Sequence, residues 1–175
     1  PTSNLESTPE SGLNSAPQAG WESGSASYPP YLYISRANAD YRRVLNEDQV
    51  IKVLKPLGFV LISLETLSVK QQANLFANAT VIVAPHGAGL TNTVFCAPGT
   101  HIVELTSPRY IRTDYWIVSH HLKLHHYCIR GEGVDCPTLR QLMYQNPLTE
   151  DIWIPSATLK AMITLVTRII NPLQG

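Results

Sequence analysis

The sequence predicts an α/β fold, with a parallel sheet of about five strands and helices on both faces of the sheet. Short apolar runs rich in β-branched and aromatic residues alternate with segments whose apolar residues recur at helical spacing, and the alternation repeats along the chain. This alternation is typical of parallel strands joined by right-handed helical crossovers, as in a Rossmann-like layer. Hydrophobic residues make up 44% of the 175 residues, which is enough for the core of one such domain.

The five expected strands are short runs that lie between turn and helix signals. The third is apolar throughout, which indicates burial on both faces of the sheet. The strands are expected at residues 31–35 (YLYIS), 59–63 (FVLIS), 80–84 (TVIVA), 101–105 (HIVEL) and 125–130 (HHYCIR).

The first two expected helices have recognisable start signals. Asn46 is a candidate N-cap, because Glu47 and Asp48 follow it in the positive first turn of the helix, and Gly58 ends that helix. Ser68 opens the second helix.

The later helices are expected after the third and fourth strands and at the end of the chain. A Gly-rich turn and a short helix follow the third strand, and another helix covers about 110–122. The last helix is capped by Ser156 and ends before Pro172. Residues 131–151 hold few apolar residues and are expected to form a long surface loop.

Residues 1–30 differ from the rest of the chain in composition. Seven Ser, five Pro and three Gly make up half of this segment, which has three Glu and neither Lys nor Arg. Such a composition buries too little apolar surface to offset the entropy of the chain. We expect a disordered linker at 1–30, with Trp21 and Tyr28 as docking points, and one Rossmann-like domain at 31–175.

Charge and hydropathy argue against several classes of function. Thirteen basic residues balance thirteen acidic ones, which disfavours nucleic-acid binding, and the chain has no apolar run long enough for an integral membrane segment. Three widely spaced cysteines suggest reduced thiols. The first residue is not Met and no signal-peptide pattern follows, so we expect a fragment. The expected location is cytoplasmic, with peripheral attachment at the inner membrane as the alternative.

Polar side chains follow the strands at the edge where parallel sheets bind ligands. Together they favour a ligand that contains phosphate. They are Ser35 and Arg36 after the first strand, Glu65 after the second, residues 85–92 after the third, Glu104, Thr106 and Ser107 at the fourth, and Arg130 at the fifth.

The loop after the third strand is the sharpest of these signals. Gly87 and Gly89 allow the backbone to approach a ligand closely, and the helix that follows offers free amide groups to an anion. Thr91 and Asn92 add hydroxyl and amide donors. The alternative is an ordinary tight turn whose glycines only permit packing. The dinucleotide motif G-x-G-x-x-G would need Gly where Asn92 stands, and there is no Walker loop.

Each charged candidate has a structural alternative. Arg36 can pair with a diphosphate or form a surface ion pair, and at least one of Arg42 and Arg43 is expected to be solvated. His86 can bind a sugar or phosphate, or serve only the turn. Glu104 can accept ribose hydroxyl groups or pair with an arginine.

Four histidines invite a metal interpretation, which we do not favour. They straddle the expected junction between a helix and a strand, and no acidic cluster accompanies them. We expect no metal and no other cofactor. The histidines are His120, His121, His125 and His126.

Three strings of residues together resemble glycosyltransferase family 61. They are YISRANADYRRVLNED from residue 33, LGF at 57–59, and VIVAPHGAGLTNTVFCAPGTHIVEL from residue 81. The resemblance covers about 31–130, roughly the C-terminal half of that family. The family includes eukaryotic transferases of O-linked N-acetylglucosamine and xylose. It also includes bacterial members, often attached to tetratricopeptide repeats, that are expected to build surface polysaccharide.

The resemblance implies an inverting, metal-independent transferase of GT-B type. In that family the C-terminal Rossmann-like half binds a nucleotide sugar, usually a UDP-sugar, and the acceptor is a hydroxyl of a glycan or protein. The donor-binding residues that it implies here are Ser35, Arg36, His86, Gly87, Ala88, Gly89, Leu90, Thr91, Asn92 and Glu104.

The resemblance does not extend to the family's N-terminal, acceptor-binding half, which we expect to be absent from this sequence. The expected partners are therefore that half, the donor, the acceptor and tetratricopeptide repeats. The catalytic base stays unassigned, with His86 and Glu104 as candidates. One alternative is a non-catalytic nucleotide-binding module. Another is a nicotinamide-dependent reductase, which Glu65 supports and Asn92 opposes.

Overall fold

A parallel five-stranded sheet forms the centre of the molecule, as the sequence predicts. The computed structural model describes residues 27–144 and 146–173. All neighbouring strands are parallel, in the order β2-β1-β3-β4-β5. The strands are β1 (Tyr31–Ile34), β2 (Val60–Ile62), β3 (Val81–Pro85), β4 (His101–Thr106) and β5 (His125–Arg130).

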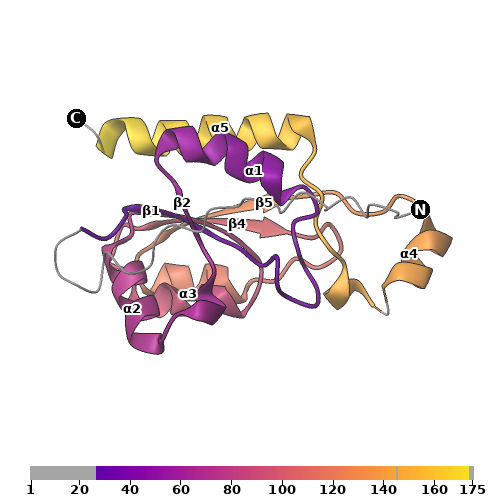
Figure 1. Cartoon of the computed structure of the whole chain (residues 1–175), viewed down its shortest axis with the longest axis horizontal. Coiled ribbons are helices and arrows are strands. Elements are labelled where there is room, and N and C mark those ends of the chain that lie inside the picture. The colour runs from indigo at the N-terminus through magenta and orange to yellow at the C-terminus, as the bar shows by residue number, and fades with distance from the viewer. Residues whose placement is uncertain (1–26, 145, 174–175) are drawn as a thin grey trace, which may run out of the picture.

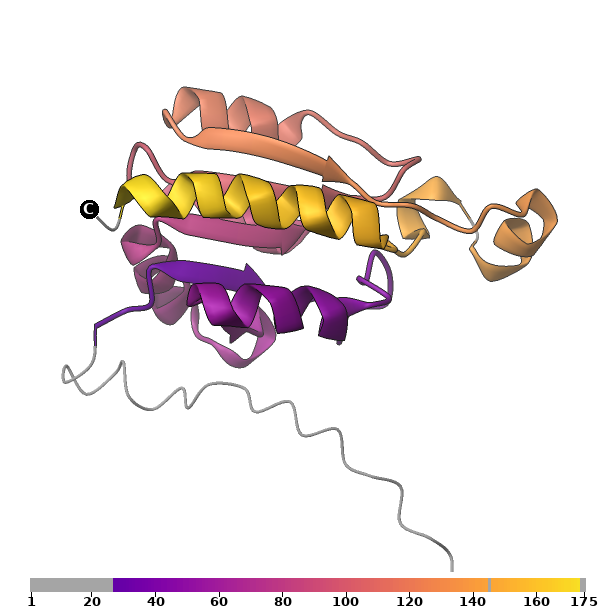
Figure 2. The ribbon, with the colours of Figure 1, turned by 90° about the horizontal axis from the view of Figure 1, so that it is seen from above.

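Helices cover both faces of this sheet (Figure 1), which confirms the predicted α/β class. One face carries α1 (Glu47–Leu54) and α5 (Ser156–Ile170), which lie along the strands in Figure 2. The other face carries α2 (Val69–Asn78), α3 (Asp114–His121) and the 3₁₀ segment η4 (Ala88–Phe95).

The core has two parts, one on each face, because successive strand residues point to opposite sides. Val81 and Val83 of β3 belong to the cluster under α1 and α5, whereas Ile82 and Ala84 belong to the cluster on the α2 side. Every residue of β3 is buried, as predicted from its continuous apolar run.

Two of the helix start signals have different outcomes. Ser68 forms a reciprocal capping box with Gln71 at the start of α2. Asn46 precedes α1, but its side chain makes no capping bond. Its amide donates to the Ile154 carbonyl oxygen (2.8 Å) and its carbonyl oxygen accepts from the Ile154 amide (3.0 Å). The predicted cap is therefore wrong: the side chain of Asn46 links α1 to the strand-like segment before α5.

The prediction of a surface loop at 131–151 is only partly correct. The segment contains α4 (Pro137–Met143) and the short 3₁₀ helix η5 (Pro147–Thr149). Glu150 and Asp151 at its end are buried. The last helix also starts one residue earlier than predicted, since Ser156 is its first residue rather than its cap, and α3 is shorter than the expected 110–122.

Most of the expected linker, residues 1–26 with Trp21, lies outside the described residues. The last residues before β1 contact the domain. The Pro30 carbonyl oxygen accepts hydrogen bonds from the backbone amides of Thr80 (2.7 Å) and Val81 (3.1 Å), and Tyr28 packs against the α2-side core. Among the described residues, every helix is too short or too polar to cross a lipid bilayer.

Candidate functional site

The strand order places a crevice at the carboxyl edge of the sheet, between β1 and β3. The chain leaves β1 toward β2 on one side, while β3 lies on the other side. Ligands of open parallel sheets bind where the strand order reverses in this way. A pocket of about 270 Å³ lies there, and its wall is formed by Ile34, Ser35, Arg36, Leu64, Glu65, Gln72, Pro85, Ala88, Gly89 and Asn92.

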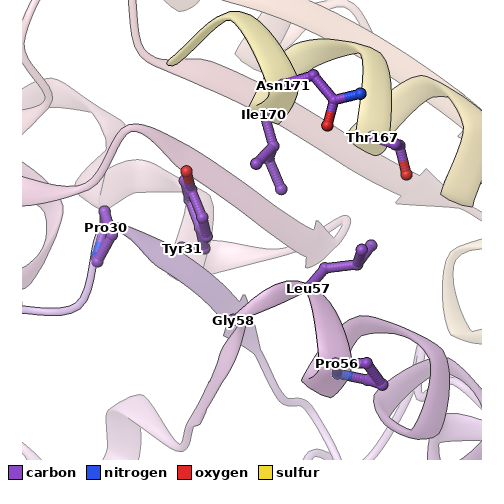
Figure 3. Close-up of a pocket in the computed structure, with 8 residues that line it drawn as sticks. All are labelled: Pro30, Tyr31, Pro56, Leu57, Gly58, Thr167, Ile170 and Asn171. Carbon is purple, nitrogen blue, oxygen red and sulfur yellow. The ribbon is translucent and has the colours of Figure 1, made fainter. Parts of the chain in front are cut away.

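A larger pocket, of about 430 Å³, lies at the opposite, amino edge of the sheet (Figure 3). Its wall has no charged side chain and includes Pro30, Tyr31, Leu57 and Ile170. We place the candidate site at the smaller pocket. Of these two pockets, only the smaller one has charged side chains in its wall, and parallel sheets bind ligands at the carboxyl edge, where it lies.

Arg36 follows β1 and is half-buried beside the smaller pocket. Its Nη2 donates to the Tyr41 carbonyl oxygen (3.2 Å), whereas its Nε is buried without a hydrogen-bond partner. Burial lowers the pKa of the guanidinium, and the nearby charge of Arg42 lowers it further. The guanidinium thus keeps hydrogen-bonding capacity at the edge of the site.

Gly87 and Gly89 both make room for side chains of this chain. A Cβ at position 87 would collide with the Arg36 guanidinium, and one at position 89 would lie 2.9 Å from Leu64 Cδ1. The packing alternative raised for these glycines therefore has a physical basis. Gly87 in particular allows the Arg36 charge to lie directly against the loop.

The rest of this loop divides between the pocket and the core. Ala88 and Asn92 line the pocket, Thr91 is exposed and Leu90 is fully buried. The Asn92 amide donates to Gln72 Oε1 (2.9 Å) and to the Gly89 carbonyl oxygen (3.2 Å). Asn92 therefore ties η4 to α2, and its amide has two protein partners.

Ser35 lines the pocket, but its hydroxyl group is occupied by α1. It donates to both carboxylate oxygens of Glu47 (3.0 and 2.9 Å), and Tyr33 donates to the same carboxylate (3.0 Å). Burial, reinforced by the charge of Glu47, raises the pKa of Tyr33. The sequence places Glu47 in the positive first turn of α1. In the structure its carboxylate also fixes α1 to the end of β1.

His86 and Glu104 form a buried pair, and His126 of β5 joins them. His86 Nδ1 bonds to Glu104 Oε1, and His126 Nε2 lies 3.1 Å from Glu104 Oε2 without the alignment of a hydrogen bond. Burial opposes ionisation of Glu104, but the two histidines outweigh it and lower the pKa of the carboxyl group. Glu104 is only 1% exposed. Its neighbours are thus histidines rather than the arginine considered from sequence.

Aromatic rings connect His86 to Arg42. The His86 ring lies 5.1 Å from the ring of Tyr110 and 5.2 Å from that of Tyr115, between ring centroids. The Arg42 guanidinium lies over Tyr110 (5.2 Å) and Tyr41 (4.8 Å). The sequence analysis assigns no role to these tyrosines, and it considers His126 only as a metal ligand.

Other candidates do not join this cluster. Ser107 donates to Glu150, which also pairs with Arg109 (3.0 Å), and Arg43 pairs with Asp151 (2.7 Å). Thr106 is buried and Arg130 is exposed.

The four histidines of the metal interpretation are dispersed. His125 stacks on His101 (4.6 Å), whereas His126 faces Glu104. His120 lies against Trp116 and His121. No group of three His, Cys, Asp or Glu side chains within the described ranges is arranged to hold a metal ion.

Two comparisons with known proteins bear on this site. A family model described as Glycosyltransferase 61 matches residues 2–103, which include β1, the Gly-rich loop and the whole pocket wall. A beta-1,2-xylosyltransferase from Oryza sativa subsp. japonica is 33% identical over 67 residues. That match covers 38% of this chain and 13% of the rice protein, so the match spans a small part of its relative.

Proposed function

The chain belongs to glycosyltransferase family 61, and from that membership we propose that it forms the donor-binding domain of a glycosyltransferase. The proposed reaction is inverting transfer of a hexosyl or pentosyl group from a nucleoside diphosphate sugar to a hydroxyl group of a glycan or protein. UDP-sugars are the donor class that we expect, bound without a metal ion.

The observation that carries the proposal is the placement of Arg36. Its guanidinium lies against Gly87 at the point where the strand order reverses, and its buried Nε has no hydrogen-bond partner. A guanidinium with free donors at this edge suits a diphosphate, because planar N–H groups pair well with phosphate oxygens.

Glu65 supports the nucleoside part of the proposal. It is exposed, follows β2 and lines the same pocket as Arg36. Its carboxylate is available to accept ribose hydroxyl groups, a role for which the buried Glu104 is badly placed. Glu65 is also compatible with a nicotinamide cofactor, the alternative that the sequence leaves open, so NADH belongs in the binding test.

The proposed chemistry is a displacement at the anomeric carbon of the donor. The acceptor oxygen forms the new bond to that carbon, the bond to the departing diphosphate breaks, and the configuration inverts. Arg36 stabilises the negative charge that develops on the diphosphate. His86 and Glu104 are 4% and 1% exposed, so we assign them to positioning the loop. We therefore propose that a group outside this chain takes the acceptor proton.

Calorimetry with UDP, uridine and NADH tests this function. We expect UDP to bind, with an affinity that EDTA leaves unchanged. Arg36→Ala should weaken UDP binding about ten- to a hundredfold, because a hydrogen bond to a charged group contributes roughly 1.5–3 kcal/mol. Uridine binding should change little, and Arg36→Lys should recover only part of the loss, because an ammonium cannot make the two-pronged contact.

Arg168→Ala is the matched control, because it removes an equal charge from an exposed position on α5. Equal losses for UDP and uridine in Arg36→Ala would contradict the phosphate assignment. Tighter binding of NADH than of UDP would favour the reductase, and loss of UDP binding in EDTA would contradict metal-free binding.

A further inference from the structure

Arg42 has a backbone conformation that arginine seldom adopts. Its φ is +57°, in the left-handed region that favours glycine. Such conformations persist where surrounding contacts fix them, and they gather at functional sites. We therefore expect contacts around Arg42 that stabilise this conformation.

Two tyrosines provide those contacts. The Arg42 guanidinium lies 4.8 Å from the ring centroid of Tyr41 and 5.2 Å from that of Tyr110. Aromatic faces attract cations, and the attraction grows when the cation is removed from water. Tyr110 also contacts the ring of His86, so the guanidinium is connected to the loop at the carboxyl edge.

The charge of Arg42 is left without an acidic partner. Its Nε is buried and has no hydrogen-bond partner, as is the case for the Nε of Arg36. Within residues 27–144 and 146–173, neither of these guanidinium groups forms an ion pair with a carboxylate. The next residue, Arg43, contrasts with them, because it is bound to Asp151 through both its backbone and its side chain.

The two guanidinium groups meet at Tyr41. Arg36 Nη2 donates to its carbonyl oxygen (3.2 Å), and the Arg42 guanidinium lies 4.8 Å from the centroid of its ring. Burial is the largest cause that lowers the pKa of Arg36, and the charge of Arg42 lowers it further, whereas Tyr41, Glu65 and Tyr115 act in the opposite direction. Two like charges with unused buried donors are stabilised when an anion lies between them.

We propose that Arg42 is a second phosphate-binding residue and forms, with Arg36, a clamp specific for a diphosphate group. The inference rests on the proposed function, and it names the feature of the donor that the site selects. Arg36 supplies one guanidinium to the phosphate oxygens, and Arg42 supplies the second. Two separate cations match the two phosphates of a nucleoside diphosphate, so the clamp distinguishes a diphosphate from a monophosphate.

The test compares UDP, UMP and inorganic pyrophosphate as ligands of the whole chain. Arg42→Gly is the informative variant, because glycine adopts a φ of +57° without strain and only the side chain is lost. We expect its thermal midpoint to be at least that of the wild type. UDP and pyrophosphate affinities should fall about tenfold or more, while UMP affinity falls by less than about threefold.

A second variant and a control separate binding from folding. Tyr110→Leu removes an aromatic face from Arg42 and should also lower the ratio of UDP to UMP affinity, whereas Arg168→Ala should leave this ratio unchanged. If the wild type binds UDP through Arg36 but Arg42→Gly keeps the ratio, the clamp is wrong and the proposed function stands. If UDP fails to bind while pyrophosphate binds through Arg42, the clamp stands and the nucleotide assignment is wrong. If neither UDP nor pyrophosphate binds, both the clamp and the proposed function are wrong.

Discussion

Glu104 shows how one side chain can serve two neighbours at once. Its two carboxylate oxygens face His86, in the loop after β3, and His126, on β5, and water has almost no access to them. A carboxylate in this position holds the loop after β3 against β5. His86 therefore depends on a residue 18 positions away for its orientation.

This arrangement predicts a pH-dependent contribution of Glu104 to stability. The histidines lower the pKa of Glu104 below its ordinary 4.5. A carboxyl group with a lowered folded-state pKa stabilises the protein above its unfolded pKa, and the contribution disappears as pH falls through the folded pKa. Glu104→Gln should thus cost about 1–3 kcal/mol at pH 7, and this difference should shrink as the pH falls below about 4.5.

Denaturant unfolding at a series of pH values measures this difference. Glu132→Gln is the control, because Glu132 is exposed and its variant should track the wild type throughout. A cost for Glu104→Gln that stays constant from pH 7 to about pH 3 would show that the carboxylate charge is unimportant to the fold.

For single residues, the sequence predicts where a side chain lies in the fold better than it predicts which side chain it contacts. Ser35 and Arg36 are found beside the pocket because they directly follow a strand, and that is visible in the local pattern. The pairing of Glu104 with His126 depends on how β4 and β5 are aligned, with Ile102 opposite His126. That register is set by packing across the whole sheet. The local sequence therefore does not distinguish an arginine from a histidine as the partner of Glu104.

Among the elements, α1 is one whose start the sequence explains incorrectly. The pattern Asn-Glu-Asp is typical of a capped helix, yet Asn46 bonds to Ile154, 108 positions along the chain. Local patterns contain no information on a segment that arrives from so far away. The buried strand β3 is the opposite case, because its apolar run by itself indicates burial on both faces.

Two substitutions distinguish a cap from a bridge at Asn46. Asn46→Ala leaves the buried backbone groups of Ile154 without partners, which should cost at least about 2 kcal/mol, compared with about 1 kcal/mol for a lost cap. Asn46→Asp keeps a good capping oxygen but loses the donor to the Ile154 carbonyl, so it should also destabilise the protein. Chemical denaturation measures both, and a neutral Asn46→Asp would favour the cap.

Over the whole molecule, the sequence predicts that polar side chains gather at one edge of the sheet, because all parallel strands end there, and the pocket with Arg36 and Glu65 lies at that edge. It does not predict α4, which lies beyond the carboxyl ends of the strands in both views (Figures 1 and 2). The apolar positions of 131–151 are too few to give a clear helical period. The burial of Glu150 depends on an arginine that follows another strand.

At the same scale, we propose that residues 1–26 are dispensable for folding of the domain, whereas residues 27–30 are not. Deletion of 1–26 should leave the thermal midpoint unchanged. Deletion of 1–30 removes the Pro30 carbonyl, which holds the start of β3, and the packing of Tyr28, so the midpoint should fall by several degrees. Calorimetric scans of both deletions make the comparison, and equal midpoints would contradict the proposal.

The amino-edge pocket of Figure 3 has a consequence for attachment. Pro30, before the first strand, and Asn171, after the last helix, line the same pocket. Tethers joined at these two points would both be attached to the domain at the amino edge of the sheet. The carboxyl edge, with Arg36 and Arg42, lies on the side of the sheet opposite these two points. Under the proposed function, a large acceptor would therefore reach that edge without crossing either tether.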